Sequence, residues 1–70
     1  MKLLIAMSIG GGSLFFRDGA TAAKPEWTNS EGLAATWPES RRADAEEIAD
    51  LIAPTEPEGR ISVEPAPYWA

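Results

Sequence analysis

The stretch KLLIAMSIGGGSLFFR, residues 2–17, decides the fold of this chain. Apolar and smaller or polar residues alternate along residues 2–9, a pattern typical of a β-strand, whose successive side chains point to opposite faces. The run Gly10 to Ser13 interrupts this pattern, and a second apolar run at residues 14–17 follows directly. Two strand-like runs joined by a glycine-rich loop predict a β-hairpin with its loop at Gly10 to Ser13.

The middle of the chain carries weaker strand signals. Residues 21–24 indicate a possible third strand, which would end at Pro25 because proline cannot donate to a sheet ladder. A polar stretch around Trp27 predicts a loop. The apolar run 33–37 is expected to be extended, since the residue before Pro38 avoids the helical region.

The hydrophobic period changes in the second half of the chain. One apolar stripe at helical spacing is formed by Ala45, Ile48, Ala49 and Ile52. This stripe predicts a helix near residues 40–53, with Ser40 as a plausible N-cap and Pro54 at its end. Residues 60–64 alternate again, which predicts a last strand packed on the first one.

Together these patterns predict an α+β fold, in which a small antiparallel sheet packs on a single helix in the order β-β-(β)-α-β. We expect one domain over residues 1–64, followed by a Pro-rich aromatic tail at residues 65–70. With 70 residues the core must be small. The predicted core residues are Leu3, Ile5, Met7, Phe16, Trp37, Ile48, Ile52, Ile61 and Val63.

The amino-acid composition argues against several classes of function. The chain has no cysteine and no histidine, so it lacks thiolate chemistry, the commonest general base and the commonest metal ligand. Lys and Arg number 6 against 11 Asp and Glu, a net charge of −5. We therefore expect no enzyme, no cofactor, no metal site and no direct binding of nucleic acid. No apolar run approaches the length of a membrane span, so no membrane partner is expected either.

Two features of the N-terminal half have a second interpretation. The apolar run after Lys2 and the later Ala20-Thr21-Ala22 have the outline of a signal peptide. We favour a core strand, because cleavage would remove the whole hairpin. The glycine-rich loop could instead cradle a phosphate, but such loops lead into a helix, whereas here an apolar strand follows.

The acidic residues of the predicted helix are candidate partner-binding residues. Glu46, Glu47 and Asp50 lie opposite the apolar stripe on a helical wheel. Arg41 and Arg42 in the first turn, and Asp50 in the last, are placed against the preference of the helix dipole. This face is either kept acidic for solubility or meets a basic protein surface.

The aromatic end of the chain offers a second candidate binding group, Tyr68 and Trp69. Pro65 and Pro67 stiffen the segment, so we expect residues 65–70 to leave the sheet as an extended tail. The tail is either a lid over the small core or an exposed anchor, because Trp and Tyr dominate interface hot spots.

The segments Trp27-Thr28-Asn29, Leu33-Ala34-Ala35-Thr36-Trp37 and Ala45-Glu46-Glu47-Ile48-Ala49 resemble a pattern of small phage and prophage proteins. There a Trp-containing loop and a short aromatic strand lead into an acidic helix, and a final strand follows. In size, acidity and lack of catalytic residues the chain is also similar to the anti-CRISPR proteins of phages, which share no common motif.

The resemblance implies a non-enzymatic, phage-encoded inhibitor that acts in the bacterial cytoplasm. Its acidic face would occupy a basic, nucleic-acid-binding surface of a host CRISPR complex, since carboxylates on a rigid helix can compete for the groups that bind phosphates. The alternative is a structural or assembly accessory that self-associates, as a homodimer for example, through a sheet edge and its tail.

Overall fold

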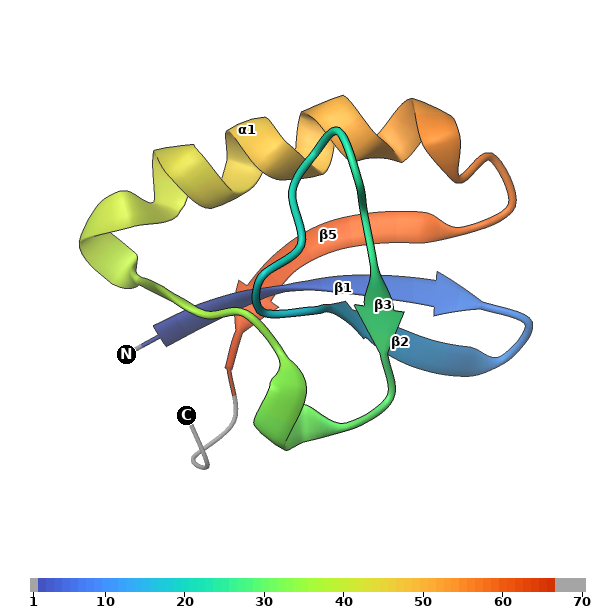
Figure 1. The fold of residues 1–70 in the computed structure, drawn as a ribbon, viewed down its shortest axis with the longest axis horizontal. Coiled ribbons are helices and arrows are strands. Elements are labelled where there is room, and N and C mark those ends of the chain that lie inside the picture. The colour runs from blue at the N-terminus through green and yellow to red at the C-terminus, as the bar shows by residue number, and fades with distance from the viewer. Residues whose placement is uncertain (1, 67–70) are drawn as a thin grey trace.

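The computed structural model describes residues 2–66, which form a five-stranded antiparallel sheet packed with one α-helix (Figure 1). The α+β class predicted from the sequence is confirmed. In chain order the elements are β1 (Lys2–Ile9), β2 (Gly12–Phe16), β3 (Trp27–Thr28), η1 (Glu31–Leu33), β4 (Trp37–Pro38), η2 (Glu39–Arg41), α1 (Arg42–Ile52), η3 (Ala53–Thr55) and β5 (Arg60–Pro65), where η denotes a short 3-10 helix.

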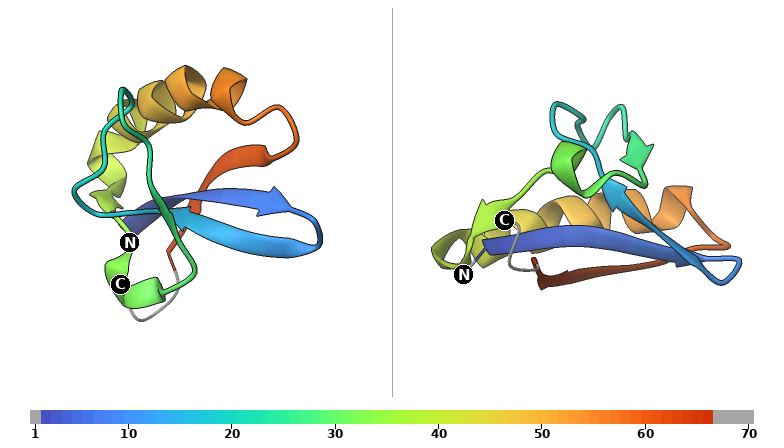
Figure 2. Two further views of the ribbon diagram at one scale, coloured as in Figure 1. Left: turned by 45° about the vertical axis from the view of Figure 1, so that its right-hand side comes forward. Right: turned by 90° about the horizontal axis from the view of Figure 1, so that it is seen from below.

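Strand β1 is the centre of the sheet. It pairs with β5 along one side, and with β2 and then β4 along the other, while β3 adds to the outer side of β2. In the right-hand view of Figure 2, β5 lies on one side of β1, and β2, β3 and the loop between them lie on the other. The predicted pairing of the last strand with the first is therefore confirmed.

The hairpin is confirmed, but its loop is shorter than predicted. Only Gly10 and Gly11 form the turn, with φ values of 57° and 82°. Positive φ at both central residues is what a two-residue type I′ turn requires, and glycine adopts it without steric cost. Gly12 and Ser13 belong to β2, where they pair with Ile9 and Ser8.

The predicted third strand at residues 21–24 is wrong. Thr21 and Lys24 close a tight turn through reciprocal backbone hydrogen bonds, and the Thr21 hydroxyl also accepts from the Lys24 N–H at 3.0 Å. The strand lies instead at Trp27–Thr28, where a loop was predicted. Of the expected extended run 33–37, only its last residue, Trp37, is in a strand.

The helix lies close to its predicted bounds, but its N-cap residue is not the predicted Ser40. Arg41 occupies the N-cap position and makes no side-chain cap hydrogen bond, while Ser40 sits inside the preceding 3-10 turn. Pro54 lies in a further 3-10 turn after the helix, so α1 ends at Ile52, just before the proline could disturb the α-helical hydrogen bonds.

The core lies between α1 and the face of the sheet that carries Ile5 and Phe16. Leu3, Met7 and Ile52 are also buried as predicted, and Phe16 meets the Trp27 ring edge-on at a centroid distance of 5.7 Å. Four predicted core residues are only half-buried and pack against this cluster: Trp37, Ile48, Ile61 and Val63.

The central strand is also buried on its other face, which the alternation pattern did not predict. Leu4 and Ala6 are 3% and 8% exposed. Both β5 and β2 flank Ala6, where Ser62 and Phe15 are its cross-strand neighbours. The side chains of these two neighbours shield Ala6 on the outer face, so period-two patterning underestimates the buried residues of β1.

The end of the described chain remains attached to the sheet. Pro65 is the last residue of β5, and the Ala66 N–H donates to the Lys2 carbonyl at 2.8 Å. The expectation that the chain leaves the sheet at residue 65 is therefore wrong for these two residues. Tyr68 and Trp69 lie outside the described residues. No helix within residues 2–66 is long and apolar enough to cross a membrane.

Candidate binding groove between the helix and the last strand

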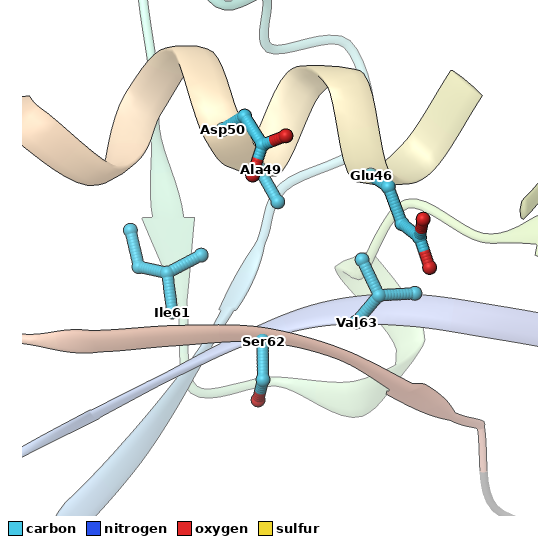
Figure 3. Close-up of a pocket in the computed structure, with 6 residues that line it drawn as sticks. All are labelled: Glu46, Ala49, Asp50, Ile61, Ser62 and Val63. Carbon is cyan, nitrogen blue, oxygen red and sulfur yellow. The ribbon is translucent and has the colours of Figure 1, made fainter. Parts of the chain in front are cut away.

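A shallow groove of about 200 Å³ runs between α1 and β5 (Figure 3). Ala49 from the helix and Ile61 and Val63 from the strand supply its apolar lining, while Glu46 and Asp50 stand on the helix side. The groove therefore combines an apolar floor with two carboxylates at its rim.

Local geometry explains why these residues meet. Ile61 and Val63 are two apart on a strand, so both side chains point to the face covered by α1. Glu46 and Asp50 are four apart on the helix and therefore share one flank. Ala49 contributes only a methyl group at the point where helix and strand face each other, which leaves space between the two elements.

Two salt bridges of the described residues lie on α1, and the one between Arg42 and Glu46 partly balances the charge along this flank, whereas Asp44 lies on nearly the opposite side of the helix from Glu46. Arg42 lies 3.6 Å from Glu46, and Arg41 lies 2.6 Å from Asp44, in pairs whose side chains are all about half exposed. These contacts give the arginines of the first turn favourable partners despite the helix dipole, although exposed pairs contribute only about 0–1 kcal/mol. Within residues 2–66, no salt bridge involves Glu47 or Asp50.

The structure separates the three acidic candidates into two groups. Glu46 and Asp50 flank the apolar stripe and line the groove, so the expectation that they lie opposite the stripe is wrong. Glu47 does point away from the groove into solvent, as an exposed residue on the far side of the helix. Successive residues of a helix are turned by about 100° around its axis, so Glu46 and Asp50 lie about 100° from the buried Ala45 and Ala49 that precede them. Glu47 lies about 200° from Ala45 and therefore faces away from the core.

Sequence reasoning missed the strand side of the groove. Ile61 and Val63 were assigned to the core, and neither Ala49 nor Ser62 was considered as a binding residue. A usable signal existed, because two carboxylates at helical i, i+4 spacing precede a short alternating strand that ends in proline. Such an order can place an acidic helix flank beside a sheet edge.

In the part of the chain that the structure describes, no group of three or more Asp or Glu side chains is placed to hold a metal ion. The Trp27 indole N–H is buried and has no hydrogen-bond partner among residues 2–66. Comparison of the chain with protein-family models, with curated proteins and with solved structures found no match.

Proposed function

We propose that this chain is a non-enzymatic binding protein whose acidic helix covers a basic, nucleic-acid-binding surface of another protein. The observation that carries the proposal is the exposure of Glu46, Glu47 and Asp50 on a helix that the core holds in place. Carboxylates on such a helix present negative charge from a backbone that is already ordered, and they can compete with phosphates for Lys and Arg.

The resemblance to small phage proteins and to anti-CRISPR proteins adds a biological setting to the proposal. In that setting the chain is a phage-encoded inhibitor, and its partner is a nucleic-acid-binding complex in the cytoplasm of the bacterial host. The net charge of −5 favours such a partner, because its attraction to opposite charge accelerates association, while acidic competitors are repelled by like charge.

The test begins with capture of partners from bacterial lysate on the immobilised full chain. Each captured protein is then purified, and its complex with nucleic acid is titrated with this chain in a mobility-shift assay. The proposal predicts that the chain displaces the nucleic acid, and that a variant with Glu46, Glu47 and Asp50 changed to Lys does not.

A matched control changes three acidic residues away from α1, namely Asp18, Glu26 and Glu31, to Lys. The control variant carries the same net charge as the test variant and should still displace the nucleic acid. If both variants lose displacement equally, total charge rather than the acidic face of α1 explains the effect. If the unmodified chain displaces no nucleic acid, the proposed function is refuted.

A further inference from the structure

We infer that the groove and the outer edge of β5 bind an extended basic segment of the partner. The segment adds to the sheet as a strand and carries Lys or Arg at alternate positions, next to Asp50 and Glu46. This inference rests on the proposed function and specifies the chemistry of the partner: a strand with charge at every second residue, rather than a folded basic surface of any shape.

The first observation is the hydrogen-bonding direction of β5. Within residues 2–66, β5 pairs with β1 alone, so its other side is a sheet edge. The Ala66 N–H donates to Lys2, and antiparallel ladders bond alternate residues. Glu64 and Ser62 therefore direct their backbone groups toward β1.

The residues between them point the other way. Ile61 and Val63 direct their N–H and C=O groups outward from the sheet, where an added strand can bond to them. Pro65 occupies the next outward position, and it has no N–H to lose there, which is the place where a strand tolerates proline. The edge of β5 thus offers two residues, Ile61 and Val63, whose backbone groups point outward, and Pro65 marks the end of this stretch.

The second observation is the match of two spacings. Four residues along α1 separate Glu46 from Asp50 by about 6 Å, and two residues along a strand span about 6.6–6.8 Å. Figure 3 places Glu46 on the Val63 side of the groove and Asp50 toward Ile61. The helix runs alongside β5, as Figure 1 also shows, so the carboxylates lie in step with alternate residues of the edge.

An added strand would use both the floor and the rim of the groove. Every strand pair in this sheet is antiparallel, and we place the added strand in the same orientation. The residues of the added strand that lie opposite Ile61 and Val63 then turn their side chains toward α1. Lys and Arg at those positions lay their aliphatic stems on the apolar floor and bring their charged ends to the carboxylates. An uncharged strand would gain the backbone bonds and the apolar contacts but no charge pairing, and an acidic strand would be repelled by Glu46 and Asp50.

Charge also decides against a second copy of this chain as the occupant. Pairing of β5 with its own copy about a two-fold axis would place both helices on one face of the joined sheet. The Glu46 and Asp50 side chains of the two copies would then face each other across the axis, where like charges repel. A basic strand has the complementary sign.

The test uses the intact chain and two fluorescently labelled peptides of identical composition. One alternates its charges, Gly-Ser-Lys-Val-Lys-Val-Lys-Ser-Gly, and in the other no two Lys residues are two positions apart, Gly-Ser-Lys-Lys-Val-Val-Lys-Ser-Gly. Fluorescence anisotropy at low salt should show binding of the alternating peptide about fivefold or more tightly, because only this peptide has Lys residues two positions apart, which can meet Glu46 and Asp50 together. Equal affinity for the two peptides would overturn the inference.

Two further arms locate the contact. The variant Glu46→Gln/Asp50→Asn should abolish the preference for the alternating peptide, whereas Asp18→Asn/Glu31→Gln, which removes the same charge elsewhere, should retain it. Methylation of the peptide nitrogens at the Lys positions should abolish binding, because those N–H groups face β5, and methylation at the Val positions should be tolerated. Circular dichroism checks that each variant folds.

These outcomes separate the inference from the proposed function. If the acidic face is needed for displacement of nucleic acid but the two peptides bind equally, the strand-addition inference fails and the proposed function stands. If neither peptide binds and sedimentation shows a dimer whose formation requires the β5 edge, the occupant is a second copy and the inference is overturned.

Discussion

Replacement of Ile52 by alanine should destabilise the fold by about 3 kcal/mol, within the range of about 2–5 kcal/mol found for such core truncations. Ile52 is fully buried, at 0% exposure, in the cluster that also contains Ile5, Phe16 and Ala49. A chain of 70 residues has a total stability of about 4–10 kcal/mol, so this one change removes a large part of it. The melting temperature should fall by about 12–24 °C.

The neighbouring Leu51 provides the matched control. Its side chain is similar in size but 58% exposed, on the flank of α1 away from the groove. Leu51→Ala should change the stability by about 0.5 kcal/mol or less. Both variants are compared by thermal unfolding followed by circular dichroism and by urea titration. A loss at Leu51 equal to that at Ile52, or a shift at Ile52 below about 4 °C, would refute the assigned helix orientation.

Three other changes test separate parts of the structure. Gly11→Ala should cost about 1–2 kcal/mol in urea unfolding, because φ is 82° at this position; an unchanged midpoint would contradict the turn geometry. Trp27→Phe should change the stability by less than about 1 kcal/mol, since removal of the unpaired buried indole N–H offsets the lost ring contacts, and a loss above about 2 kcal/mol would indicate a hidden partner for that N–H. Reversal of Glu46, Glu47 and Asp50 to Lys should leave the circular dichroism spectrum intact, while stopped-flow kinetics should show slower association with a basic partner and weaker salt dependence.

The hydrophobic periods were sufficient to predict the hairpin, the helix and the last strand. They succeeded because each element has one face on the core and repeats its apolar residues at its own period. They failed where a neighbour rather than a period decides the outcome. Trp27 is in a strand because it pairs with Phe16, and Ala6 is buried between its cross-strand neighbours Ser62 and Phe15.

The candidate site was predictable only in part, for the same reason. The acidic character of Glu46 and Asp50 is visible in the sequence, but their position beside Ile61 and Val63 depends on where α1 lies over the sheet. A helical wheel measures angles about one helix axis and contains no information on which strand is next to which flank. The groove is a property of the tertiary packing.

The central claim is that a partner strand adds to the outer edge of β5 beside the acidic flank of α1. Its most direct test is amide hydrogen exchange, measured by NMR on the free chain and on the chain saturated with the alternating Lys-Val peptide. Exchange should slow at the outward-facing amides of Ile61 and Val63 and change little at Ser62 and Glu64, which already bond to β1. Unchanged exchange at Ile61 and Val63 in the bound state would contradict the claim.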